Sequence, residues 1–356
     1  MDLLVMNTNV EAIALIDTFT SLIWTDRYSA YGDFEIYTTI NANIIDSFKD
    51  DYYLWNPESE HTMIIEEREI VSDVENGDRL LVKGRSLESI LLRRIVWKQT
   101  ILSGNLQEGV KKLLDENVIS PEDEKRKISN FVFVESTDPA ITELTVDAQF
   151  MGDNLYDAIK KLCDTHSIGF KIVLTDDGLF RFGLYAGTDR TYDQSNNPYV
   201  IFSPSFENVI SSNYLESKMN FKTVTLVAGE GEEPSRKTVT VEIEAGGGSG
   251  LDRREKYTDA RHLRSETDEG TLSDAEYSAQ LTQKGNEDLA ENAYVKAFEG
   301  QVETSRTFVY GKDFFMGDIV QVANNYGNES KSRVVELVRS QSETGIEIFP
   351  TFTVVV

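Results

Sequence analysis

The sequence is poor in cysteine and histidine, and this shortage excludes most metal and redox chemistry. Cys163 is the single cysteine among 356 residues, so the chain can form neither an intramolecular disulfide nor a thiolate metal cluster. His61, His166 and His262 lie in three separate regions, with no Cys, Asp or Glu at the spacing of a known metal motif. We therefore expect ordinary core or surface histidines, no metal site and no cofactor.

Basic residues are also scarce. Lys and Arg number 35 against 61 Asp and Glu, which gives a formal net charge of −26. Such a surface repels the phosphate backbone and disfavours tight binding of nucleic acid, although an acidic excess also serves solubility alone.

Apolar runs stay short of the roughly 18 residues that a membrane span needs. The first 24 residues contain no Lys or Arg, whereas a secretory signal begins with basic residues. We expect a soluble chain without a membrane anchor, made in the cytoplasm.

Motifs of catalysis are missing as well. The sequence has no Gly-x-Ser-x-Gly elbow, and the glycine-rich run at 245–250 leads into Leu-Asp-Arg-Arg instead of the Lys-Ser/Thr of a P-loop. Cys163 falls on the apolar stripe of a predicted helix, where an inert buried thiol is expected. Acidic residues are so abundant that pairs at glycosidase separation arise by chance. We predict no catalytic residue, and a protein that is not an enzyme.

Alternating apolar and polar residues predict β structure at both ends of the chain. Residues 33–40 show this period of two, and strands at 62–71 and 79–83 flank an Asn76-Gly77 turn. Short strands from 317 onward, with turns at 324–328 and 343–345, indicate a second small barrel.

Helical periodicity marks the regions between. Ser86, Asn105 and Asp153 can each begin a helix, and a capping box runs from Ser273 to Glu276. Strands at 170–174 and 179–184 predict an antiparallel sheet. The fold class is α+β, mainly β, with two small β-barrel domains, an α/β middle domain and a helical insertion. The predicted boundaries are a first β-barrel region at 1–100, completed by strands within 205–230, an α/β middle domain at 101–204, a second β-barrel region at 205–262 and 298–356, and the insertion at 263–297.

Aromatic residues gather in two clusters near the N-terminus. Sugar-binding modules use such platforms, but aromatics also fill small barrels and subunit contacts, and we favour the second reading. The clusters are Trp24, Tyr28 and Tyr31, then Tyr52, Tyr53 and Trp55.

Two further segments set opposite charges side by side where no substrate pocket is evident. Intersubunit salt bridges or internal loop anchors use such pairs. The resulting candidates for structural or interface roles are Gly187, Asp189 and Arg190, then Arg253, Arg254, Glu255, Asp259 and Arg261.

In their joint order these segments, with those at 24–36 and 84–95, resemble the siphophage tail protein family of Reqi-Pepy type. That family is similar to the central baseplate hub of contractile-tailed phages and to the N-terminal part of tail-associated lysins. The resemblance spans nearly the whole chain and implies a tail-hub-like homotrimer, in which two barrels per subunit form a ring of six. It offers no catalytic residue.

The function implied is that of a hub that closes the distal end of the tail tube, connects it to the tail tip and gates DNA ejection. The implied partners are the distal tail protein or tail-tube hexamer, the tape-measure protein, tail-tip or receptor-binding proteins, and passing DNA that is not tightly bound. The implied location is the tail tip of the virion, after assembly in the bacterial cytoplasm. Because the chain ends at Val356 directly after a predicted strand, a lysin domain is not expected. The alternatives are a carbohydrate-binding adsorption module and a cell-wall hydrolase.

An acidic wall suits a channel for DNA, because a basic lumen would hold each passing phosphate. The candidates for this wall are Asp50, Asp51, Glu230, Glu232 and Glu233.

Overall fold

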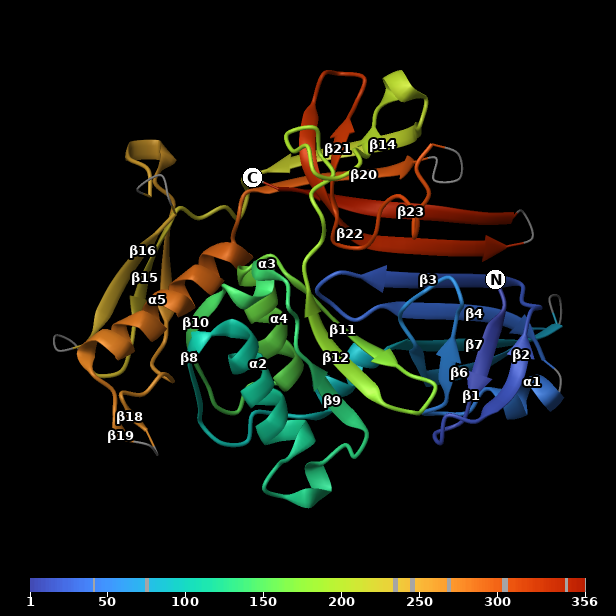
Figure 1. Ribbon diagram of the computed structural model, residues 1–356, viewed down its shortest axis with the longest axis horizontal. Helices are drawn as coiled ribbons and strands as arrows, with labels where there is room; N and C mark the ends of the chain where they lie inside the picture. The colour runs from blue at the N-terminus through green and yellow to red at the C-terminus, as the bar shows by residue number, and fades with distance from the viewer. Residues whose placement is uncertain are drawn as a thin grey trace.

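The computed structural model describes all residues except 41, 74–76, 233–235, 244–246, 268–269, 303–306, 343–344 and 356. Three sequence expectations involve residues outside this description: Asn76 of the first hairpin turn, the Glu343-Thr344 turn, and Glu233 of the acidic wall. The fold is mostly β with several sheets, as expected (Figure 1). Within the described part of the chain no sheet closes on itself, so the two β regions are open in the single subunit.

One large sheet joins the two ends of the chain. Its main path is β14-β20-β23-β22-β3-β4-β7-β6-β5-β1-β2, and β21 and β13 branch from β22. In Figure 1 the N-terminal strands lie directly beside the C-terminal ones along the β3–β22 contact. The strands are β1 (Leu3–Met6), β2 (Ala12–Ile16), β3 (Ser21–Arg27), β4 (Asp33–Thr39), β5 (Tyr53–Trp55), β6 (Met63–Asp73), β7 (Gly77–Ser86), β13 (Ile201–Phe202), β14 (Val209–Ser217), β20 (Val295–Val302), β21 (Ile319–Ala323), β22 (Glu329–Ser342) and β23 (Gly345–Val354), with helix α1 (Ala42–Ser47) after β4.

The period-two pattern of β4 has the expected consequence. Phe34 and Ile36 are buried, whereas Glu35 and Tyr37 between them are partly exposed. Trp24 of β3 and Phe34 pack together in the same core, with ring centroids 6.1 Å apart.

The middle region holds two small sheets and most of the helices. Asn105 caps α2 by accepting from the Glu108 amide at 3.2 Å, as predicted. The helix predicted from Asp153 is instead capped by Asn154. The elements are η1 (Leu87–Arg93), β8 (Thr100–Asn105), α2 (Leu106–Leu114), the π-helix η2 (Asp115–Ile119), η3 (Glu124–Arg126), β9 (Phe131–Val134), α3 (Pro139–Thr142), β10 (Thr145–Phe150), α4 (Leu155–Thr165), β11 (Gly169–Leu174), β12 (Phe180–Tyr185) and η4 (Pro204–Phe206).

The predicted antiparallel pairing of 170–174 with 179–184 is confirmed in β11 and β12, although β9 joins β12 in parallel and makes the sheet as a whole mixed. Two other expectations for this region are wrong. Ser86 precedes a 3₁₀ helix and makes no capping hydrogen bond, because its hydroxyl is engaged by Glu88 and by the Gly32 amide. The periodicity after Ser86 also places Ile95 on the same apolar helix face as Leu91, but Ile95 lies beyond the end of η1 and is 41 % exposed.

Residues 224–291 form a separate unit at one side of the molecule, in which α5 covers a three-stranded sheet (Figure 1). The capping box of Ser273 and Glu276 is confirmed. Gly285, which weakens the helix locally, allows it to lie close, since a Cβ there would stand 2.5 Å from a methyl of Val241. The region 205–262, which the sequence analysis assigns to the second β-barrel region, divides between two sheets. Its first long strand, β14, joins the large sheet, whereas the strands that follow pair among themselves. The elements are β15 (Val224–Ala228), β16 (Thr238–Glu242), η5 (Gly250–Asp252), β17 (Glu255–Asp259), β18 (Glu266–Thr267), β19 (Gly270–Thr271) and α5 (Asp274–Glu291).

No described helix combines the length and apolar character needed to cross a membrane.

Candidate functional site

The N-terminal strands, the middle region and the C-terminal strands meet at a bulge in β22. Before the bulge, β22 pairs with β21, and after it the same edge pairs with β3. At the bulge the Tyr28 amide donates to the Val335 carbonyl at 2.9 Å, and the Gly317 amide donates to the Val334 carbonyl at 2.9 Å. The bulge therefore lets one strand hold two different neighbours along one edge.

Tyr28 fills the space between these parts. Its ring is buried and lies so close to Gly169 and Gly317 that an added Cβ would come within 2.6 Å and 2.3 Å of it. Gly317 also has a φ of 89°, which favours glycine. Tyr185 packs edge-on against Tyr28 with ring centroids 5.1 Å apart, and the Arg333 guanidinium lies 5.2 Å from the ring centroid. Burial raises the pKa of Tyr28, so the phenol stays neutral.

Arg190, which the sequence places beside Asp189, lies at this junction, but its ion-pair partner is Asp318. Arg190 Nε is 2.5 Å from Asp318 Oδ2, and Asp318 Oδ1 accepts from the Thr188 amide at 2.7 Å. Asp189 accepts from the Thr191 amide at 2.8 Å instead. A Cβ on Gly187 would lie 1.8 Å from the Gly317 carbonyl oxygen. Arg190 thus anchors the 187–191 loop to the start of β21 within one chain.

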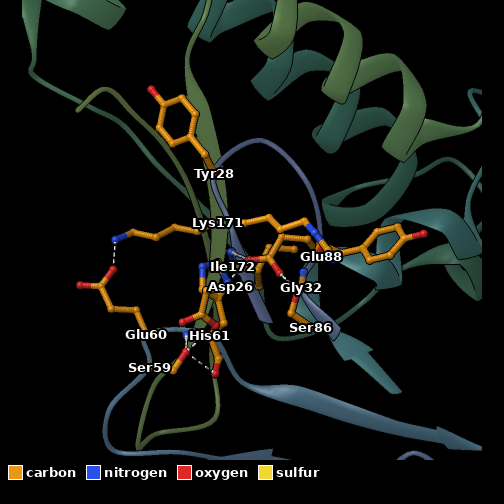
Figure 2. A network of polar contacts seen from close by, with 12 residues as sticks. Asp26, Tyr28, Gly32, Ser59, Glu60, His61, Ser86, Glu88, Lys171 and Ile172 are labelled. Carbon is orange, nitrogen blue, oxygen red and sulfur yellow. Dashed lines mark hydrogen bonds and ion pairs between the residues drawn. The ribbon is translucent and has the colours of Figure 1, made fainter. Parts of the chain in front are cut away.

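A buried carboxylate and histidine extend the junction toward the N-terminal sheet (Figure 2). Glu88 is fully buried, 3.1 Å from His61 Nδ1, and accepts from the Ile172 amide at 2.7 Å and from the Ser86 hydroxyl. Burial alone lowers the pKa of His61, but the charge and hydrogen bond of Glu88 raise it to about 9. At neutral pH the two groups therefore form an ion pair that ties the segment before β6 to η1, and the hydrogen bond from the Ile172 amide ties η1 to β11.

The network continues through Ser59 to a second buried ion pair. The Ser59 hydroxyl donates to Asp26 Oδ1 at 2.8 Å and accepts from the His61 amide at 3.0 Å (Figure 2). Asp26 Oδ2 is 2.5 Å from Arg339 NH1, and both side chains are almost fully buried. Trp24 Nε1 donates to Asp26 at 3.0 Å, and Arg339 NH2 donates to the Glu58 carbonyl at 2.6 Å. None of the side chains in this cluster has a fully buried polar atom without a hydrogen-bond partner, as burial demands.

A cavity of about 430 Å³ opens beside these residues. Charges of both signs line it, among them Glu60 and Lys171, which pair with each other. Among the described residues no group of three His, Cys, Asp or Glu could hold a metal ion. The arrangement can lock three parts of the chain together, and it presents no activated nucleophile.

The second set of predicted residues lies around β17, away from this junction. Arg253 bonds Glu255 at 2.7 Å and Glu242 at 3.1 Å. Arg254 donates to the Lys218 carbonyl at 2.9 Å. Asp259 binds both Arg261 and Arg236, and the hydrogen bond from Arg261 lowers its pKa to about 2. These charges therefore have partners within the same chain.

The aromatic clusters have largely packed inward, which accords with a role in the core. Trp24 and Tyr28 are buried, and Trp55 is 41 % exposed. Sequence reasoning missed Trp97, which is 64 % exposed and follows the end of η1. The sequence around it carries little signal, because Trp97 lies between the helices predicted from Ser86 and Asn105 and outside both aromatic clusters.

Three of the acidic residues expected to line a DNA channel make ion pairs or hydrogen bonds within the chain. Asp50 and Asp51 pair with Arg68 and Arg93, and Glu230 accepts from the Ser265 amide at 3.0 Å. Cys163 is fully buried, and burial raises the pKa of its thiol, consistent with an inert side chain.

Comparison with known proteins gives a family and a fold. The model of the siphovirus ReqiPepy6 Gp37-like proteins matches residues 2–352. A tail protein from Neisseria meningitidis MC58 is similar with a TM-score of 0.60 and 12% identity, over 99% of this chain and 96% of that one. The 43 kDa tail protein of prophage MuSo2 from Shewanella oneidensis has a TM-score of 0.59 and 12% identity, over 99% and 98%. Prophage tail protein gp18 from Listeria monocytogenes EGD-e has a TM-score of 0.56 and 12% identity, over 99% and 94%. None of the curated proteins compared with the sequence matches it.

Proposed function

Because the chain belongs to the siphovirus ReqiPepy6 Gp37-like family, we propose that it is the hub of a phage tail, which closes the distal end of the tail tube, connects it to the tail tip and gates DNA ejection. Membership of this family makes it a structural tail protein of the virion. The observation that carries the hub proposal is the extent of the likeness, since the tail-protein fold covers 99% of the chain.

The continuous large sheet supports a role in transmitting force. The N-terminal strands, the C-terminal strands and the middle region are joined by main-chain pairing between β3 and β22 and by two buried ion pairs. A load applied to one region is therefore shared by many hydrogen bonds before the subunit deforms. A protein that relays receptor contact from the tail tip to the tube needs such stiffness.

The outer strands of the sheet support assembly into a ring. β2 and β14 are its end strands and carry exposed apolar side chains, among them Leu15 at 65 % and Ile210 at 61 %. Open apolar edges are usually covered by a neighbour. We propose a homotrimer in which the two β regions of each subunit become barrel-like units, so that six of them match a sixfold tube or distal tail protein.

Its further proposed partners are the tape-measure protein and the tail-tip or receptor-binding proteins, at the tail tip of a virion assembled in the bacterial cytoplasm. DNA would pass without tight binding, because the net charge of −26 per chain repels phosphate. We propose no catalytic activity on the cell wall.

Analytical ultracentrifugation of the purified chain at up to tens of micromolar, followed by cryo-electron microscopy of the complex with its distal tail partner, tests the proposal. We expect trimers, and a ring of six β units coaxial with the tube. A chain that stays monomeric at tens of micromolar and forms no ring with the partner would refute the hub role.

A further inference from the structure

Trp97 is the most exposed of the three tryptophans and lies beside a second cavity. Its side chain is 64 % exposed, against 0 % for Trp24 and 41 % for Trp55. The cavity has a volume of about 610 Å³ and is formed by the segment before β8 together with η2 and the loop that follows it. It is distant in the chain from the β3–β22 junction, and the proposed hub function makes no use of it.

The indole of Trp97 is held in place although it is exposed. The Arg126 guanidinium lies 5.1 Å from the ring centroid and is itself fixed by donating to the Ile95 carbonyl at 2.7 Å and to Asn117 Oδ1 at 3.0 Å. The same Asn117 oxygen accepts from the Trp97 amide at 3.2 Å, and the Asn117 amide group donates to the Leu113 carbonyl at 2.9 Å. The ring therefore has a fixed cation over it, and most of the side chain remains exposed. A platform held in this way loses little freedom when a ligand stacks on it.

The backbone of η2 provides a second observation. Residues 115–119 form a π-helix, a rare arrangement that is frequently found at functional sites. This turn supplies Glu116 and Asn117 to the cavity wall. Glu116 accepts from the Thr100 hydroxyl, which fixes its carboxylate in turn. An irregular helix that presents two fixed polar groups beside an exposed tryptophan is more than core packing requires.

The chemistry of the lining selects one class of ligand. Three carboxylates, those of Glu116, Glu122 and Asp123, face two cations, Lys98 and Arg126, so phosphate and sulfate groups are repelled on balance. Gln99 and Ser120 add uncharged donors and acceptors. An aromatic plane surrounded by amide, hydroxyl and carboxylate groups suits a pyranose ring, whose C–H face stacks while its hydroxyls exchange hydrogen bonds. We propose that Trp97 and this cavity bind a short glycan of neutral or amino sugars.

The binding test uses the full chain labelled with ¹⁵N-tryptophan, which reports three indole N–H resonances assigned by single Trp→Phe variants. The probes are the trisaccharides of N-acetylglucosamine, glucose and galactose, together with glucosamine, each up to about 10 mM. We expect at least one of them to shift the Trp97 resonance saturably and to leave Trp24 and Trp55 unchanged. If none of the probes moves the Trp97 resonance, the proposal is wrong.

Two variants separate this site from binding elsewhere. Trp97→Ala removes an exposed side chain and should fold, and it should weaken binding of the active probe at least tenfold in a calorimetric titration. Trp55→Ala is the matched control and should bind as the unaltered chain does. Equal affinity in both variants, or protection of Trp97 by a tail-protein partner with no effect of any sugar, would overturn the proposal. Neither result bears on trimer formation, so the hub function is tested independently.

Discussion

Replacing Arg339 with methionine tests the idea that buried charge holds the two ends of the chain together. Arg339 and Asp26 lie on paired strands and are 2 % and 3 % exposed at their side chains. The variant Arg339→Met keeps much of the side-chain volume but leaves the Asp26 carboxylate in the interior without its cation. It also removes the donor to the Glu58 carbonyl.

The expected loss is large because an unpaired buried charge is costly. Breaking a buried ion pair by removing one partner costs about 3–5 kcal/mol of unfolding free energy. Lys111→Met provides the matched control, since Lys111 and its partner Glu135 are 34% and 58% exposed. An exposed pair of that kind contributes about 0.2–1 kcal/mol. The two variants should therefore differ by at least about 2 kcal/mol.

Urea unfolding followed by tryptophan fluorescence measures both values, because Trp24 donates to Asp26 and reports directly on the site. The double variant Asp26→Asn with Arg339→Met should recover part of the loss, since no charge is then left buried. If Arg339→Met proves as mild as Lys111→Met, the pair is not a structural lock. If the double variant equals the sum of the single ones, the two side chains are not coupled.

Three further changes probe the junction. The pKa of His61, about 9 against 6.5 for an ordinary histidine, means that its contribution of about 3 kcal/mol is complete below pH 6.5 and is lost as the pH rises through 9. The fall in urea midpoint from pH 7 to pH 9.5 should shrink markedly in His61→Gln, and an unchanged fall would exclude the histidine as its cause. Gly187→Ala should lower the free energy of unfolding by about 3 kcal/mol, because the added Cβ would lie 1.8 Å from the Gly317 carbonyl oxygen. Gly183→Ala is the control, since its added Cβ would lie 3.9 Å from the Val134 carbonyl oxygen, and it should melt almost as the original chain does. Arg190→Ala leaves the buried Asp318 without its cation and should lower the melting temperature or weaken oligomerisation; a chain unchanged in both would remove this ion pair from the account.

Local signals predicted the elements well, since capping and alternation depend on neighbouring residues. Asn105 and Ser273 cap their helices through contacts three residues away, and the alternation in β4 needs only its own side chains. Ser86 failed as a cap because its hydroxyl bonds to the amide of Gly32, 54 positions earlier. The periodicity after Asp153 predicted helix α4, but it did not show that Asn154, and not Asp153, is the capping residue.

The site was harder to predict because its partners are distant in the chain. Sequence reasoning singled out Arg190 but assigned no role to Asp318, which lies 128 positions further on. Nothing near Asp26 indicates that its cation is Arg339, 313 positions away. Trp97 was missed for a different reason, because exposure depends on how η2 packs and not on the residues beside the tryptophan.

The pairing of β3 with β22 also has a consequence during synthesis. Arg27 of β3 bonds Glu336 of β22 across 309 positions. A ribosome adds about 5–20 residues per second, so β3 waits about 15–60 s for this neighbour to be made. Throughout that interval one edge of the strand lies open to another growing chain on the same messenger. Messages that end early, before β22, would release polypeptides whose exposed strand edge promotes aggregation.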